Sequence, residues 1–311
     1  MCRIALRVIY RLPGRGTSAG IDARKDQVLR QIIRCTLVVP GLFVLALAGM
    51  LAPASAQGRL EARYSATIAG IPIGSGTWAI DVADAQYTAT ANGSTSGLLR
   101  AFTGGQGDSS AHGTLNGGRP LSSTYAATIS SRKKSDVIRF TIVNGNVKDL
   151  KVDPPQDDDP ERVPLTEAHQ HGVFDPMTAS IVRVPGNGEL LSSEACQRTL
   201  AIFDGRLRYD MQFAFKRMDK VKASKGYVGP VVVCSAYFTP VAGYIPSRAA
   251  IKYLAKQRDM EVWLAPIAGT RVLVPFRAQG PTPIGQAVLE AYEFVSIPVP
   301  TRASVNGPKV Q

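Results

Sequence analysis

The chain has 311 residues, and its 36 Lys and Arg against 24 Asp and Glu give a net charge of +12. No basic stripe is interleaved with aromatic residues, and no phosphate-cradling glycine loop or dinucleotide fingerprint occurs, which argues against nucleic-acid and nucleotide binding. The 29 glycines and 21 prolines, set between short alternating runs, favour a β-rich chain over a helical one.

Residues 1–56 are predicted to be a secretory signal peptide with an extended basic n-region. An uncharged apolar run spans 36–52, Arg30 and Arg34 precede it, and small residues lie before a cleavage point at Ala56–Gln57. The alternative is an uncleaved membrane anchor. The run is short for a spanning helix, and a proline and a glycine interrupt it, so we expect cleavage.

Cleavage changes the charge of the protein. Removing the eight basic and two acidic residues of 1–56 leaves 28 basic and 22 acidic residues, a net charge of +6. A moderate positive charge suits a periplasmic or otherwise exported protein that works near anionic surfaces such as lipid headgroups.

Residues 57–295 are predicted to form a single β-rich domain. Strict alternation of apolar and polar residues over 59–69 is the pattern of a half-buried strand. Asn-Gly pairs at 116–118 and 144–146 predict hairpin turns. Further strands are expected at 76–82, 86–91, 109–115, 121–130, 136–143 and 147–152, with a short helix at 96–102.

An acidic, proline-rich loop at 153–161 is a candidate boundary between two halves of this domain. After it come Glu167, His169 and His171, which would share one face of an extended segment and could then bind a metal ion. A plain polar loop is the alternative, and we expect no metal or other cofactor. Asp175 before a proline is typical of a helix N-cap and predicts that a helix starts there.

The second half is again predicted to be strands, at 198–203, 206–215, 227–238, 260–266, 271–277 and 286–295, followed by a flexible tail at 296–311. Asp204-Gly205 predicts a tight hairpin. On the strand after it, Arg206 or Arg208 can pair with Asp210 along one face, which is a structural role. Ligand binding by these three residues and Asp175 is the alternative.

The cysteines predict one disulfide. Cys2 and Cys35 leave with the signal peptide, and Cys196 and Cys234 remain. A lone pair in an oxidising compartment usually forms a bridge, and two free buried thiols are the alternative. The bridge would close a loop of 38 residues, worth about 3–4 kcal/mol. A plain hairpin would set Cys196 opposite Phe213, so the chain must bend to reach Cys234.

One hairpin loop of the second half is strongly basic. Its cations are Lys216, Arg217, Lys220, Lys222 and Lys225. A solvated surface is one interpretation. The other is an edge that contacts phospholipid or lipopolysaccharide headgroups, with membrane contact at most peripheral after signal cleavage.

Several motifs occur in a recognisable order. F-D-G-R-L-R-Y-D at 203–210 lies between the two cysteines, and P-V-A-G-Y follows at 240–244. Together with I-P-I-G at 71–74 and V-P-F-R at 274–277, this order resembles the exported bacterial proteins grouped as domain of unknown function 3108. The resemblance spans most of residues 60–295 and implies an exported β-rich domain. By looser analogy it suggests a curved sheet like those of lipoprotein carriers.

The predicted fold is mainly β: a large curved antiparallel sheet or partly closed barrel with one or two short helices. We expect a non-catalytic envelope protein that binds a lipidic or amphipathic ligand in the curved sheet. A scaffold for envelope assembly is one alternative. An enzyme acting on cell-wall material, with Asp175, His169 and Arg206 in one cleft, is the other. We assign no catalytic residue, because the serine-hydrolase elbow pattern has Thr95 at its centre.

Overall fold

The structure, a computed structural model, describes residues 57–299 apart from 84–85, 98–103 and 117–118. The predicted signal peptide at 1–56 lies outside the described residues, as do residues 300–311 of the expected tail. Most of the helix expected at 96–102 and the centre of the turn at 116–118 also lie outside them.

The chain folds mainly into strands, as predicted. The first half contributes β1 (Gly58–Ile68), β2 (Ile71–Val82), β3 (Gln86–Thr95), β4 (Gln106–Asn116), β5 (Arg119–Ser130), β6 (Ser135–Val143) and β7 (Asn146–Asp153). The second half contributes β8 (Val182–Arg183), β9 (Arg198–Phe203), β10 (Arg208–Lys222), β11 (Lys225–Gly226), β12 (Val228–Ala242), β13 (Met260–Pro266), β14 (Val272–Thr282) and β15 (Gly285–Pro298). β15 therefore extends into the segment expected to be the tail.

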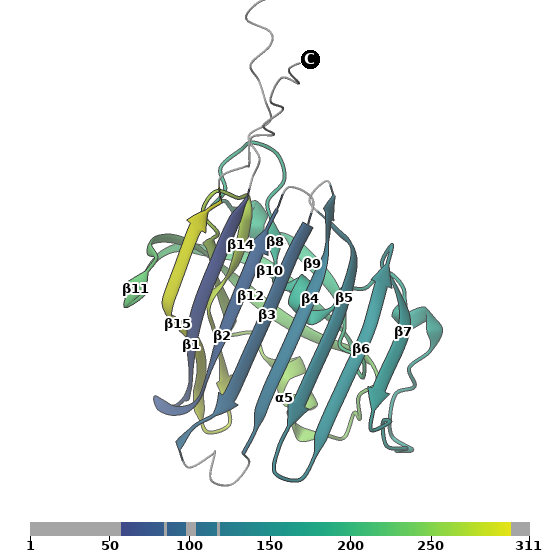
Figure 1. Ribbon diagram of the computed structural model, residues 1–311. Coiled ribbons are helices and arrows are strands. Elements are labelled where there is room, and N and C mark those ends of the chain that lie inside the picture. The colour runs from purple at the N-terminus through teal and green to yellow at the C-terminus, as the bar shows by residue number, and fades with distance from the viewer. Residues whose placement is uncertain (1–56, 84–85, 98–103, 117–118, 300–311) are drawn as a thin grey trace, which may run out of the picture. The chain divides into compact units, whose positions relative to one another are not determined.

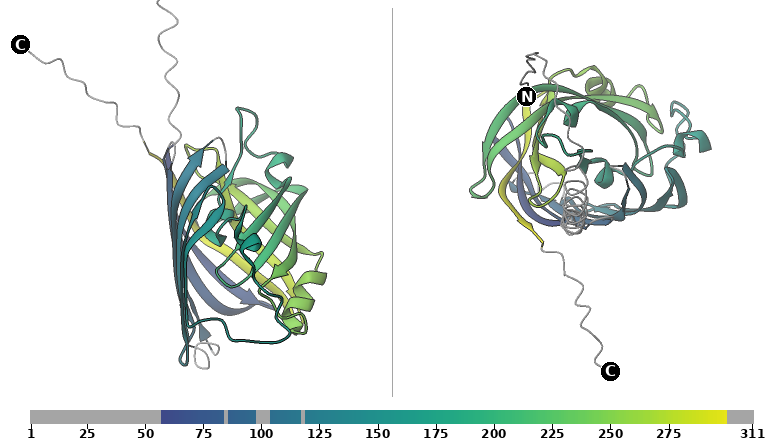
Figure 2. Two further views of the ribbon diagram at one scale, coloured as in Figure 1. Left: turned by 90° about the vertical axis from the view of Figure 1, so that its right-hand side faces the viewer. Right: turned by 90° about the horizontal axis from the view of Figure 1, so that it is seen from above.

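All fifteen described strands belong to one sheet, whose main order is β7-β6-β5-β4-β3-β2-β1-β15-β14-β13-β12-β10-β9. Every pairing is antiparallel except the short contact of β11 with β15. The pairing of β1 with β15 joins the two halves. The sheet curls around an interior (Figure 2), and in the described chain its end strands β7 and β9 do not pair, so it is not closed. This confirms the predicted fold class.

The first half is a simple meander, and its sequence shows why. In β1, Leu60, Ala62 and Tyr64 are buried and alternate with exposed neighbours, so one face of the strand packs inward. Between β6 and β7, Asn144 and Gly145 both have positive φ angles, of 50° and 79°. Two such residues form the two-residue turn that suits the twist of a hairpin, which confirms the turn predicted at 144–146.

The second half is thicker, because β12 is buried on both faces. Val231 and Val233 belong to the large apolar cluster of the interior. Val232 and Cys234 belong to a smaller cluster on the other face, with residues of β8, β13 and β14. The unbroken apolar run at 231–234 is therefore the sequence pattern of a strand that is covered on both sides.

The short helical segments that lie wholly in the described part of the chain are η1 (Glu167–Gln170), α4 (Pro176–Ala179), η2 (Ser193–Cys196) and α5 (Ala249–Lys256). The helix predicted after Asp175 is confirmed as α4, whereas α5 was not predicted. Among the described residues, no helix has the length and apolar character needed to cross a membrane.

Candidate functional site

The short helix α4 lies against the inner face of the first half and is held there by one buried carboxylate. Asp175 is fully buried and accepts a hydrogen bond from the N–H of Thr178 at 2.9 Å. Its other oxygen accepts from the hydroxyls of Ser123 at 2.6 Å and Thr178 at 2.5 Å. Since a buried carboxylate needs such donors, the position of α4 is fixed from β5 as well as by its own cap.

Tyr87 of β3 completes this polar cluster, because its hydroxyl is hydrogen-bonded to that of Thr178. Burial, and then the negative charge of Asp175, raise the pKa of the Tyr87 phenol well above its ordinary value. The phenol therefore stays protonated. The cluster anchors α4 to two strands of the first half.

A cavity of about 610 Å³, here called cavity A, lies beside α4. Its walls come from β1–β3, α4, β14 and β15, and include Tyr64, Trp78, Met177, Pro275 and Leu289. Its surface is mostly apolar, and its volume lies within the range of small-molecule binding sites, about 300–1,000 Å³. The sequence predicted that the curved sheet would have such a space.

Three glycines of β2 and β3 line cavity A. Gly74, Gly76 and Gly93 line it at positions where β2 and β3 elsewhere place side chains such as Trp78 and Ala91. Within the described chain, a Cβ atom at Gly93 would lie 3.4 Å from the carbonyl oxygen of Ser75 and 4.0 Å from the Cα of Gly76. Gly93 therefore has room for a side chain, whereas a Cβ atom at Gly74 or Gly76 would meet a carbonyl oxygen of β3 at 2.9 or 2.6 Å.

A second cavity, cavity B, has a volume of about 290 Å³ and shares Ser180 and Pro275 with cavity A. Most of its wall is apolar, from Leu200 and Ile202 of β9, Met211 and Phe213 of β10, and Val262 and Leu264 of β13. Arg198, at the start of β9, is the one charged residue in this lining. Cavity B thus combines apolar walls with a single cation.

Arg206 does not pair with Asp210, which was one of the two pairings that the sequence allowed. Its Nη2 lies 2.8 Å from the Asp136 carboxylate of β6 and donates to the carbonyl of Pro154 at 2.9 Å. Asp204 accepts hydrogen bonds from the N–H groups of Arg206 and Leu207. These bonds make a four-residue loop between Phe203 and Arg208, rather than the tight turn at Asp204-Gly205 that the sequence predicted.

Arg208 pairs with Asp210, and this alternative was predicted. The Arg208 Nη1 lies 2.7 Å from the Asp210 Oδ1. Both residues are on β10, two positions apart, so they share one face of the strand. Neither lines the two cavities described above, and their contact is the ion pair along one strand face that the sequence allowed.

The segment with Glu167, His169 and His171 is not extended, so these side chains do not share the one face that the metal-binding alternative required. It forms η1, because the Nδ1 of His169 accepts a hydrogen bond from the N–H of Thr166 at 3.1 Å and closes a turn. Only a long contact of 3.9 Å joins His171 to Glu167. Within the described ranges, no three His, Cys, Asp or Glu side chains are grouped to hold a metal ion.

Asp175, His169 and Arg206 therefore each have different partners. Asp175 is bonded to Ser123 and Thr178 in the interior, His169 to Thr166, and Arg206 to Asp136. The described contacts therefore do not bring these three residues together in the single cleft that a cell-wall enzyme would require.

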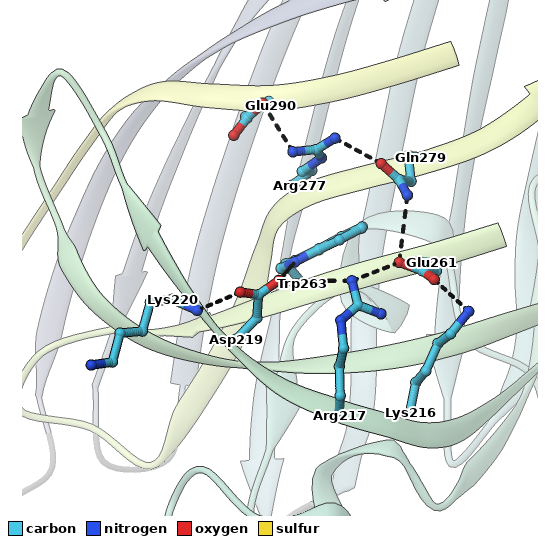
Figure 3. A network of polar contacts seen from close by, with 9 residues as sticks. All are labelled: Lys216, Arg217, Asp219, Lys220, Glu261, Trp263, Arg277, Gln279 and Glu290. Carbon is cyan, nitrogen blue, oxygen red and sulfur yellow. Dashed lines mark hydrogen bonds and ion pairs between the residues drawn. The ribbon is translucent and has the colours of Figure 1, made fainter. Parts of the chain in front are cut away.

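The basic segment is not a hairpin loop, and that expectation was wrong: β10 continues to Lys222 and carries Lys216, Arg217, Lys220 and Lys222, and Lys225 is on β11. Lys216 and Arg217 contact the carboxylate of Glu261 at 2.5 and 3.1 Å (Figure 3). Arg217 and Arg277 both lie over the ring of Trp263, at 5.3 and 4.9 Å from its centroid. These cations tie β10 to β13 and β14.

The lysines at the end of β10 and on β11, here called the outer lysines, are different. Lys220, Lys222 and Lys225 are exposed and, within the described chain, have no ion-pair partner. Only these three of the five cations are available to an anionic surface.

The predicted disulfide is present between Cys196 and Cys234, with Cα atoms 5.4 Å apart. The pairing of Arg198 with Phe213, continued by two residues, places Cys196 level with Phe215, which itself pairs with Cys234. The turn η2 carries Cys196 across β10 to β12. The longer loop at Asp204 thus aligns Cys196 with Phe215 and Cys234, and η2 provides the bend that the bridge requires.

Comparison with known proteins places these features in a family. Residues 63–292 match the family model described as "Protein of unknown function (DUF3108)". No curated protein matches the chain significantly. A similar solved structure is titled "Crystal Structure of Beta-barrel-like Protein of Domain of Unknown Function DUF1849 from Brucella abortus". It is 7% identical, the match covers 78% of this chain and 98% of that one, and the TM-score is 0.43.

Proposed function

We propose that this chain, which belongs to the DUF3108 family of proteins of unknown function, is an exported, non-catalytic protein that binds a lipidic or amphipathic ligand. The observation that carries the proposal is cavity A, an apolar space of about 610 Å³ inside the curved sheet. Removing an acyl chain from water into such a space gains about 0.8 kcal/mol for each buried CH₂ group. The Asp175 cluster supports the proposal, since it holds α4 at the cavity wall.

Export is supported by two features. The Cys196–Cys234 disulfide is of the kind that persists in oxidising compartments. The N-terminal sequence has the order of charged, apolar and small residues that a signal peptidase recognises. A periplasmic or otherwise exported location would bring the protein close to membrane lipids.

The outer lysines suggest how the protein would meet those lipids. Lys220 and Lys222 are exposed at the end of β10 and Lys225 is exposed on β11, and each basic residue near an anionic membrane surface contributes about 1 kcal/mol. The wild-type protein should sediment with anionic vesicles more than with neutral ones, and replacement of all three lysines by Gln should remove the difference.

Native mass spectrometry and lipid extraction of the protein, purified from its own compartment, test the main proposal. A co-purifying lipid is expected. Gly93→Val would fill part of cavity A and should lower the amount bound, whereas Gly188→Val, at a loop position where a Cβ atom meets nothing within 4 Å, should not. An empty wild-type protein that also fails to bind added lipids would contradict the proposal.

The scaffold alternative is less well supported. β7 is an end strand of the sheet and could in principle pair with a partner chain. It is short and carries Lys148, Asp149 and Lys151, and charged residues on end strands are typical protection against such pairing. The apolar cavity therefore remains the stronger indication.

A further inference from the structure

The chemistry of cavity B refines the proposed ligand. Arg198 contributes the only charge among its lining residues, and the neighbouring side chains on β9 and β10 are apolar. The Nε of Arg198 is buried and finds no hydrogen-bond partner in the described part of the chain. Arg198 as a whole is half-buried, and a buried N–H donor that lacks a partner is unfavourable, because it has left water without replacement.

Nearby acidic groups do not compensate this cation. Among the described residues, no carboxylate forms an ion pair with Arg198. Burial alone lowers the pKa of its guanidinium, without an opposing contribution from an acid. The site therefore has an unmatched positive charge that an anion from outside the chain would balance.

We infer that cavity B holds the anionic head of a single-chain amphiphile against Arg198, while its acyl chain lies along the apolar wall towards Ser180 and cavity A. This inference rests on the proposed function and specifies the ligand class. The guanidinium presents a planar set of N–H donors that matches a carboxylate or a phosphate. The shared lining residues Ser180 and Pro275 place the two cavities next to each other, and an acyl chain that passes these two residues would reach cavity A.

The experiment compares two probes with the same acyl chain: hexadecanoate, which is anionic, and hexadecanamide, which is neutral. Binding to the full mature protein is measured by calorimetry below the concentration at which either probe aggregates. Because hydrogen bonds to charged groups are worth about 1.5–3 kcal/mol, the wild-type protein should bind the anion about tenfold or more tightly. Hexadecyl phosphate should share this preference if the charge, rather than the carboxylate itself, is recognised.

Variants locate the effect. Arg198→Met keeps the apolar length of the side chain and should abolish the preference for the anion while leaving hexadecanamide affinity unchanged. Arg198→Lys keeps the charge and should retain most of the preference. Arg139→Met, at an exposed position on β6, removes the same charge elsewhere and should have no effect.

The outcomes separate the two proposals. If both probes bind the wild-type protein equally, or if Arg198→Met keeps the preference, this inference is overturned while the proposed function stands. If neither probe nor any extracted lipid binds, the proposed function itself fails. Should Arg198→Met not fold, a photoreactive fatty acid can be crosslinked to the wild-type protein: labelling of peptides from β9 and β10 supports the site, and labelling confined to other strands overturns it.

Discussion

The Arg206 guanidinium on the loop between β9 and β10 lies 2.8 Å from the Asp136 carboxylate at the start of β6. These residues come from opposite ends of the strand order, and their contact brings the two halves of the open sheet together. Next to them, a Cβ atom on Gly205 would lie 2.4 Å from the Cγ2 of Ile138. The F-D-G-R motif is thus the point at which the second half packs on the first.

Gly205→Ala should destabilise the protein strongly. The residue has a φ of +99°, and its new Cβ would overlap the buried Ile138 side chain. The strained backbone costs on the order of 1–3 kcal/mol, and overpacking adds about 1–3 kcal/mol. Chemical denaturation measures the loss.

Gly186→Ala is the matched control for this substitution. Gly186 also has a positive φ, of +70°, but a Cβ atom there meets nothing within 4 Å. It should therefore show the backbone cost alone. Equal losses at the two glycines would mean that the Ile138 contact does not restrict position 205.

Replacing both Cys196 and Cys234 by Ala should lower the free energy of unfolding. The bridge closes a sequence separation of 38 residues, and loss of a native disulfide typically costs about 2–5 kcal/mol. Peptide mapping without reduction should recover the two cysteines joined. Two thiols that react with an alkylating agent in the native protein would contradict this.

Much of the sheet could be predicted, because alternation is a local signal. The burial pattern of β1 and the positive φ angles at Asn144 and Gly145 follow from neighbouring residues. η1 was not predicted because reciprocal hydrogen bonds between Thr166 and His169, one between backbone groups and one to the His169 side chain, favour a turned segment over an extended one. α5 was not predicted because it has only eight residues and no capping side chain marks its start, although Ala, Leu and Lys there favour a helix.

The sequence predicted that the sheet has an apolar cavity, but not which residues line it. A charged residue at the start of a strand, such as Arg198, is usually solvated, and its burial arises only when β9, β10 and β13 are assembled. In the same way, Gly93 is an ordinary strand glycine until β2 and β3 bring it beside Gly76. Long-range packing sets both features, and no local pattern records it.

The free energy of unfolding should depend on pH through the carboxyl group of Glu261. Burial acts to raise the pKa of this carboxyl group, but the hydrogen bonds from Arg217 and Lys216 outweigh burial, and the pKa lies below its ordinary value. The folded state therefore favours the charged form. Its contribution is fully present above the unfolded pKa, about 4.3, and is lost as the pH falls through the lower folded pKa.

Glu261→Gln should remove this part of the acid dependence. Urea denaturation of the wild-type protein and the variant, from pH 6 downwards, should show curves that converge as the pH falls. Glu61→Gln changes the same charge at a side chain that is 66% exposed and should leave the wild-type slope in place. A constant difference between wild type and Glu261→Gln over the whole range would rule out the linkage.

Asp175→Ala should both destabilise the protein and weaken ligand binding in cavity A. The substitution leaves the N–H of Thr178 and the hydroxyls of Ser123 and Thr178 without their acceptor in a fully buried place, at a cost of about 1–3 kcal/mol for each unsatisfied group. Ser131→Ala is the control, because it removes the hydroxyl of an exposed residue that bonds only to Lys134 among the described contacts and lines neither cavity. Since α4 supplies Met177 and Ser180 to the wall of cavity A, a loosened helix should bind hexadecanamide more weakly even below the unfolding transition. Unchanged affinity in a destabilised Asp175→Ala protein would show that the cluster supports the fold without shaping the cavity.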